Sequence, residues 1–223
     1  MVHLRRIIYF STPLILYIIF TMGNSSSNLP ALQTVSNCIT ERMMGTWFVI
    51  AVKPTAFETH NSNAVERYTW LDEKSYIGND FAIDFQYNAD EPITSKLKSM
   101  PQRGWIDDKL SVNVDKENRI KTKTGNWLVS PMWPLKLPYL LLEVDTENYS
   151  YCVVGYPSRA YCWIMGRTPQ MDETLYQSLI DKLMNKHQYD LDGLRKVPQK
   201  WTAEERSKRN LVNEIPYSML EKN

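Results

Sequence analysis

The chain has 223 residues, of which 43% are hydrophobic and 12% aromatic, and its formal net charge is +1. The length fits one domain with attached tails, and this hydrophobic content excludes a disordered chain. Basic and acidic residues are balanced, 26 against 25, so we expect no nucleic-acid partner. With three histidines and three cysteines and no C-x-x-C pair, we expect no metal site and no cofactor.

The chain begins with a targeting signal. Arg5 and Arg6 precede an apolar stretch over residues 7–22, which is the pattern of a signal peptide. The stretch is slightly long for a cleaved signal and short for a membrane span, and Pro13 disfavours a straight anchor helix. Residues 1–27 are therefore predicted to be a signal peptide or signal-anchor with a short linker. We expect the secretory pathway, with a secreted or luminal/vacuolar product or, as the alternative, membrane anchoring.

That compartment bears on two kinds of residue. Asn24 and Asn148 begin N-glycosylation sequons. Among Cys38, Cys152 and Cys162, one pair could form a disulfide and leave one thiol over. The alternative is three buried, unpaired thiols.

The folded region consists of strand signals separated by turn signals. Eight strands are predicted, over residues 45–53, 64–71, 80–88, 102–114, 119–129, 137–145, 149–156 and 159–167. Turns are expected at residues 115–118 and at Pro157-Ser158. Such closely spaced strands indicate an all-β antiparallel meander, and closing it into an up-and-down β-barrel removes the two exposed edges.

One strand shows a clear period of two. Phe81, Ile83, Phe85 and Tyr87 share one face of residues 80–88, while the residues between them share the other. In a closed barrel these four side chains should point inward.

The period then changes to that of a helix. Residues 172–186 place five apolar side chains on one stripe, and Asp172 or Thr168 could cap the start. This C-terminal α-helix should pack on the outside of the barrel. Residues 193–198 could add one more short strand.

The last segment, residues 201–223, is mostly polar and reads as a C-terminal extension with a short helix over residues 202–210. Its apolar end could support a homo-oligomer, and the alternative is a frayed terminus. This end comprises Ile215, Pro216, Tyr217, Met219 and Leu220.

Three motifs occur in chain order along the strands. Gly45-Thr46-Trp47 opens the first strand, Val144-Asp145 precedes Tyr149-Ser150-Tyr151, and Arg167 ends the segment Trp163-Ile164-Met165-Gly166-Arg167. This set resembles the three conserved blocks of the lipocalins. Four more segments, residues 63–68, 133–136, 153–159 and 194–199, are similar to bacterial outer-membrane lipocalins, plant temperature-induced lipocalins and apolipoprotein D. The resemblance covers roughly residues 38–200, and we predict a lipocalin domain over 28–200.

The resemblance implies a structural plug at one end of the barrel. Trp47 would close the floor, Arg167 would stack across it, and Gly45 would allow the tight turn beneath them. It also implies further ligand-binding wall residues beside the four inward side chains of residues 80–88. These are Tyr68, Trp127, Tyr139 and Leu141.

The resemblance further implies a ligand and not a reaction. We expect a small hydrophobic or amphipathic ligand, such as a fatty acid, lysophospholipid or sterol-like molecule. The implied roles are lipid transport, membrane maintenance and protection from lipid oxidation, with membrane association. Two alternatives remain: an interaction module whose barrel is filled by its own side chains, and an isomerase that uses a cavity thiol. No histidine lies near Cys152 or Cys162 in sequence, so we expect no enzyme and no catalytic residue.

Overall fold

The computed structural model describes residues 29–56, 58–71, 80–90, 92, 94–106, 123–132 and 134–221. The chain divides into two units, Met1–Pro30 and Ala31–Asn223, and every element described below belongs to the second. The predicted targeting segment and Asn24 lie outside the described residues.

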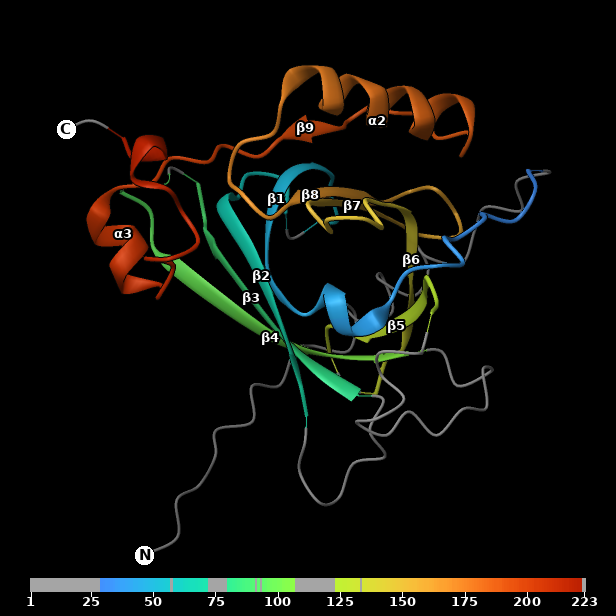
Figure 1. Ribbon diagram of the computed structural model, residues 1–223, viewed down its shortest axis with the longest axis horizontal. Coiled ribbons are helices and arrows are strands. Elements are labelled where there is room, and N and C mark those ends of the chain that lie inside the picture. Colours follow the sequence, from blue (N-terminus) through green and yellow to red (C-terminus); the bar gives the residue numbers. More distant parts are fainter. Residues whose placement is uncertain are drawn as a thin grey trace, which may run out of the picture. The chain divides into compact units, whose positions relative to one another are not determined.

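Eight strands in the described part of the chain form a closed antiparallel barrel (Figure 1). They are β1 (Gly45–Lys53), β2 (Ser62–Trp70), β3 (Asp80–Asn88), β4 (Leu97–Ile106), β5 (Asn126–Ser130), β6 (Leu137–Val144), β7 (Tyr151–Gly155) and β8 (Cys162–Gly166). Each strand pairs with its neighbour in sequence, and β1 pairs with both β2 and β8. The ring of hydrogen bonds is therefore complete, and the predicted eight-stranded up-and-down barrel is confirmed.

Alternation along β3 separates the two faces of the barrel wall. Phe81, Ile83 and Phe85 are at most 2% exposed and belong to one buried cluster, here called the inner cluster. Asp84 has the opposite parity and accepts hydrogen bonds from Gln86 and Ser99. The period of two therefore places apolar side chains inside the barrel and polar ones outside.

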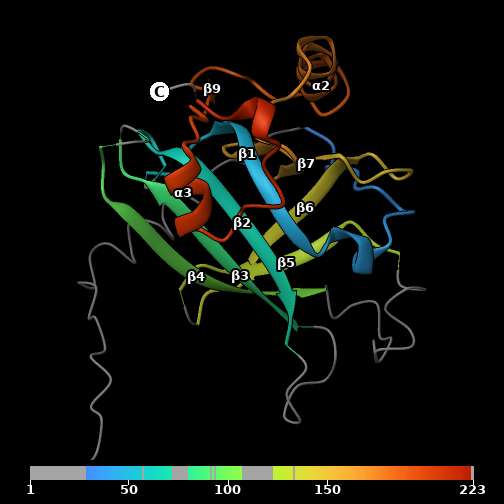
Figure 2. The same ribbon diagram turned by 60° about the vertical axis from the view of Figure 1, so that its left-hand side comes forward.

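A helix, α2 (Glu173–Asn185), lies across the outside of the barrel over β1, β7 and β8 (Figures 1 and 2). Asp172 is the residue that caps it, because its Oδ1 accepts a hydrogen bond from the Leu175 amide at 3.0 Å. Leu179 and Leu183 are fully buried in a second cluster with outward-facing side chains of those strands. The predicted helix and its position outside the barrel are confirmed.

One carboxylate ties the end of α2 to the barrel. Glu143 on β6 lies 3.4 Å from Lys182 Nζ, 2.5 Å from Lys186 Nζ and 2.7 Å from His187 Nε2. The side chains of Glu143 and His187 are 10% and 2% exposed, so their contact is shielded from solvent, whereas the two lysines are 42% and 56% exposed.

Strand β1 changes its neighbour halfway along. Gly45 to Phe48 pair with β2, whereas Ala51 and Val52 pair with the short strand β9 (Arg195–Lys196). Between these halves, Gln199 Nε2 donates to the carbonyl oxygens of Val49 at 2.9 Å and Ala64 at 3.2 Å. The chain after α2 thus fills the seam where β1 and β2 diverge.

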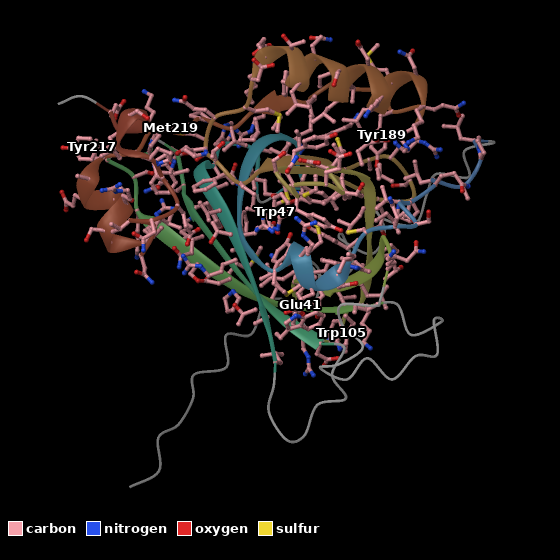
Figure 3. All side chains as sticks on the ribbon, viewed as in Figure 1. Glu41, Trp47, Trp105, Tyr189, Tyr217 and Met219 are labelled. Atoms are coloured by element: carbon pink, nitrogen blue, oxygen red, sulfur yellow. The ribbon has the colours of Figure 1, made fainter. Side chains whose placement is uncertain are left out.

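The C-terminal extension packs on the outside of the barrel. It contains α3 (Ala203–Lys208) and the short 3-10 helix η3 (Tyr217–Met219). The Trp201 ring meets the Phe48 ring edge to face at 5.9 Å, and Arg209 Nη1 donates to the Asn63 carbonyl at 2.7 Å. Ile215 is 1% exposed and belongs to the same cluster as Leu179 and Leu183, so this part of the apolar end packs within the chain. Tyr217, by contrast, is 79% exposed (Figure 3).

Several strand ends differ from the prediction. Strand β4 begins at Leu97, before the predicted residue 102, and it continues through Pro101. The missing Pro101 amide is tolerated because β5 pairs with β4 only from Arg103 onward, so this part of β4 has one neighbour. Strands β7 and β8 are shorter than predicted because Tyr149 and Arg159 have positive φ angles of 58° and 60° and fall in turns.

The chain between β4 and β5 is described only in part. Strand β5 begins at Asn126, later than predicted, because the described residues just before it make a different contact. Among them, Lys123 forms an isolated bridge with Ile39. The predicted turn at residues 115–118 and the strand residues 107–122 lie outside the described residues.

Candidate functional site

Arg167 and Trp47 meet at the end of the barrel where β1 begins and β8 ends. The Arg167 Cζ atom lies 3.7 Å from the centroid of the Trp47 ring. The guanidinium also donates to the carbonyl oxygens of Thr46 at 2.8 Å, Arg42 at 2.8 Å, Met44 at 3.0 Å and Tyr149 at 3.2 Å. Trp47 is fully buried and lies inside the ring of strands (Figure 3).

Gly45 occupies the turn that leads into this contact. Its φ is +95°, a region that other residues rarely adopt. A Cβ atom at this position would also lie 3.3 Å from Arg167 Nη1. The three residues predicted as a plug are therefore adjacent in the fold.

The eight predicted wall residues all lie on the inner face. Seven are buried members of the inner cluster, and Tyr87 is half-buried and packs against it. The rings contact one another: Phe81 and Trp127 have centroids 4.9 Å apart, and Tyr68 and Phe81 are 5.7 Å apart. This interior is mainly apolar and aromatic.

A buried carboxyl group that was not predicted lies among these rings. Glu66 on β2 is 6% exposed, and its Oε2 accepts hydrogen bonds from the hydroxyls of Tyr68 at 2.6 Å and Tyr139 at 3.2 Å. Burial raises the pKa of Glu66 to about 7, although the two hydroxyls oppose the shift. Strand parity alone could have located it, because Glu66 is two residues from Tyr68 and shares its face.

A second buried carboxyl lies in the loop between β1 and β2. Glu58 is 6% exposed; its Oε1 accepts from Trp163 Nε1 at 2.9 Å and its Oε2 from the Thr55 hydroxyl at 2.7 Å. Burial raises the pKa of Glu58. Because Glu58 lies in a loop, no strand period could have indicated its position.

One polar atom in the interior has no partner among the described residues. Trp127 is 1% exposed, and its Nε1 donates no hydrogen bond there. Its ring stacks on Tyr139, with centroids 6.4 Å apart. A buried indole N–H without an acceptor is costly, so this atom marks a position that suits an acceptor from a ligand.

The three cysteines are free and buried. The disulfide considered from the sequence is therefore not formed, and the alternative of three unpaired thiols applies. Cys152 belongs to the inner cluster, whereas Cys162 belongs to the second cluster, which lies between the barrel and α2. Those two lie on opposite faces of the wall and cannot bridge. Burial raises the pKa of Cys162 to about 12, and that of Cys38 to about 12 as well.

The structure also bears on three further features: a glycosylation sequon, metal ligands and membrane-spanning helices. Asn148 is exposed in the turn between β6 and β7, where a glycan could be attached. Over the residues that the structure describes, no group of three or more His, Cys, Asp or Glu side chains could hold a metal ion. In that same part of the chain, no helix is both long and apolar enough to cross a membrane.

A closed antiparallel barrel with an aromatic interior, an Arg–Trp contact at one end and a helix outside defines a small-ligand-binding barrel of the calycin type. The chain belongs to the lipocalin-like domain family, whose model matches residues 40–199. Lipocalins bind small hydrophobic ligands.

Individual proteins agree with this assignment. The chain is 29% identical over 178 residues to temperature-induced lipocalin-1 of Arabidopsis thaliana, covering 78% of this chain and 86% of that protein. It is 24% identical over 169 residues to the outer membrane lipoprotein Blc of Vibrio cholerae, covering 76% and 87%. Its fold is similar to that of insecticyanin from the tobacco hornworm Manduca sexta, with a TM-score of 0.53, 14% identity and coverage of 81% and 89%.

Proposed function

We propose that this barrel binds a small hydrophobic or amphipathic molecule in its interior and that the protein acts as a carrier. The observation that supports this most is the inner face, where aromatic and aliphatic side chains surround a few polar atoms. Ligand sites are typically lined in this way, with few polar groups that orient the guest. Fatty acids, lysophospholipids and sterol-like molecules are the candidate classes, and lipid transport, membrane maintenance or protection from lipid oxidation the candidate roles.

The thiols favour a carrier over an enzyme. A nucleophilic cysteine needs a lowered pKa, usually from a neighbouring cation or base. Burial instead raises the pKa of Cys152, the cysteine of β7 that faces the interior. An isomerase that uses a cavity thiol is therefore disfavoured.

The direct test is extraction of the full protein, purified from its native source, with organic solvent followed by mass spectrometry. We expect about one lipid per chain. If no lipid is recovered and none of the three candidate classes binds on titration, the filled-barrel alternative replaces the carrier.

Two tryptophan variants locate the bound molecule. Trp127 lies on the inner face, whereas Trp201 packs outside the barrel. Ligand titration should quench the tryptophan fluorescence of wild type and of Trp201→Phe, and quench Trp127→Phe less. Equal quenching in both variants would mean that the ligand does not lie beside Trp127.

The secretory pathway is part of this proposal, supported by the signal-like pattern of residues 1–27 and by the exposed position of Asn148. Sequencing the N-terminus of the mature protein tests whether that segment is removed. A mass decrease on N-glycosidase treatment that is absent in Asn148→Gln would show that this sequon is used. The proposed membrane association has support from the similar Vibrio protein, which is an outer membrane lipoprotein.

A further inference from the structure

We propose that the barrel prefers an amphiphile whose polar end is a protonated amine, held by Glu66 among the aromatic rings. This inference rests on the proposed carrier function and narrows its ligand class. It disfavours free fatty acids, whose carboxylate would meet a carboxyl group in the interior.

The first support is the absence of a compensating cation at Glu66. Within the described part of the chain, its Oε2 accepts from the hydroxyls of Tyr68 and Tyr139, and no Lys, Arg or His nitrogen lies within 4.0 Å of the carboxylate. A buried charge is costly unless it is paired. A cationic ligand would supply the missing partner.

The second support is the set of rings around that carboxyl. Tyr139 stacks between two indoles, with centroids 6.4 Å from Trp127 and 6.2 Å from Trp163. Glu66 accepts from the hydroxyl of the central ring, and Glu58 accepts from the Trp163 Nε1 at one end of the stack. Aromatic faces beside a carboxylate form the arrangement that recognises ammonium groups, through cation–π attraction and charge.

The third support is the charge balance between the two carboxyls. Both carboxyls accept hydrogen bonds from the same ring stack, Glu66 from the Tyr139 hydroxyl and Glu58 from the Trp163 indole, and the charge of Glu58 adds to burial in raising the pKa of Glu66. Burial raises the pKa of Glu58, and the positive charge of Arg195 opposes that shift. Arg195 nevertheless donates its hydrogen bonds to the Glu58 backbone carbonyl and to Asn61. Within the described residues, its guanidinium donates no hydrogen bond to either carboxylate, so a cationic ligand beside Glu66 would also offset the charge of Glu58.

The fourth support is independent of the carboxyls. The indole N–H of Trp127, whose ring centroid is 6.2 Å from that of Tyr68, lacks an acceptor among the described residues. An oxygen next to the amine, as in a long-chain amino alcohol, would satisfy this donor while the amine binds Glu66. Tyr68 contacts both groups, through its ring with Trp127 and through its hydroxyl with Glu66, so a strong acceptor and a donor without a described partner lie on either side of one residue.

The test compares three ligands that share a twelve-carbon chain: dodecylamine, dodecanol and dodecanoic acid. Each is titrated into the full protein at pH 7.5 below its micelle concentration, with tryptophan fluorescence as the readout. We expect a Kd for the amine about tenfold or more below that of the alcohol, with the acid binding most weakly. Dodecylamine is protonated at this pH, as a lysine side chain is.

Glu66→Gln supplies the specific variant, because glutamine keeps the size and an acceptor but loses the charge. It should weaken amine binding about tenfold and change alcohol binding less than twofold. Asp84→Asn is the matched control, since Asp84 loses the same charge on the outer face of the neighbouring strand. It should leave all three affinities unchanged.

The outcomes separate this inference from the proposed function. If the acid binds as tightly as the amine, or if Glu66→Gln leaves the amine-to-alcohol ratio unchanged, the preference for an amine is wrong while the carrier stands. If none of the three ligands binds wild type, and none of the sterols and lysophospholipids does, the carrier function itself fails. Should Glu66→Gln not fold, the ratio of amine to acid binding in wild type still decides.

Discussion

The Arg167 guanidinium lies over the Trp47 ring at 3.7 Å and at the same time donates to four backbone carbonyl groups. These carbonyls belong to two separate segments, the start of β1 with the 3-10 helix before it (η1, Thr40–Met43) and the turn between β6 and β7. One side chain thus joins three parts of the chain at one end of the barrel.

We expect Arg167→Met to lower the free energy of unfolding by about 3 kcal/mol, because it removes the contact with Trp47 and leaves four carbonyl groups without this donor, three of them in partly buried hydrogen bonds. Urea unfolding measures the change. The free energy of unfolding of Arg167→Lys should lie between those of wild type and Arg167→Met, since lysine keeps the charge but lacks the planar guanidinium.

Lys136→Met is the control for this prediction. The Lys136 Nζ lies 4.4 Å from the Trp105 ring centroid, but this lysine is exposed. We expect a loss of at most about 1 kcal/mol, as for exposed cation–π contacts. Equal losses in the two variants would mean that the Arg167 hydrogen bonds add nothing.

The pH dependence of stability should reveal Glu66. Burial raises its pKa to about 7 from an ordinary 4.5, so the folded state binds the proton more tightly than the unfolded state. Stability is therefore greatest below pH 4.5 as far as this group is concerned, and it falls by about 3 kcal/mol as pH rises through 7. The neighbouring Tyr68, Tyr139 and Cys152 keep their protons in this range, because burial raises each pKa.

Glu66→Gln should remove that fall. The measurement is urea unfolding of both proteins at several pH values between 4.5 and 8. Glu58, whose pKa burial also raises, is present in both proteins and contributes to both profiles. Parallel stability profiles for wild type and variant would contradict the prediction.

Glu143 should affect the pH dependence of stability in the opposite direction to Glu66. Burial alone would raise its pKa, but hydrogen bonds from His187 and Lys186 and the charges of Lys186 and Lys182 outweigh burial and lower the pKa to about 2. Its contribution is complete above the ordinary 4.5 and is lost as pH falls toward 2. We expect Glu143→Gln to cost about 1–3 kcal/mol at pH 7 and almost nothing at pH 2. A cost independent of pH would indicate a packing defect instead.

The C-terminal extension should be essential for stability. Trp201 is 1% exposed against Phe48, so Trp201→Ala should cost about 3–5 kcal/mol in thermal or urea unfolding. Tyr217→Ala, at a ring that is 79% exposed in the same segment, should cost less than about 0.5 kcal/mol. Similar losses of stability in the two variants would contradict the prediction, because burial of the ring would then not determine the cost.

The inward face of β3 was predictable because its burial follows strand alternation, a purely local signal. The Trp47–Arg167 contact was predictable only through the ordered motifs, since its partners are far apart in the chain. The start of β4 was missed because Pro101 argues against a strand unless one knows that β5 stops short of it. Local pattern cannot supply that pairing.

Of the two buried carboxyl groups, one could be predicted from local pattern and the other could not. Glu66 follows from the parity of Tyr68, whereas Glu58 reaches Trp163 from a loop, across 105 residues of sequence. The buried extension was also beyond prediction, because Trp201 and Ile215 belong to a polar segment. Their burial depends on a barrel surface that forms elsewhere in the chain.

The divided pairing of β1 has a consequence for biosynthesis. Gln199 meets Val49 across 150 residues of sequence, and β9 supplies the edge that β2 leaves open. A chain emerging from the ribosome therefore carries β1 with half of one edge unpaired until residues 195–199 have been made. During that interval this edge is where a nascent chain would misassociate with another, and where a chaperone would protect it.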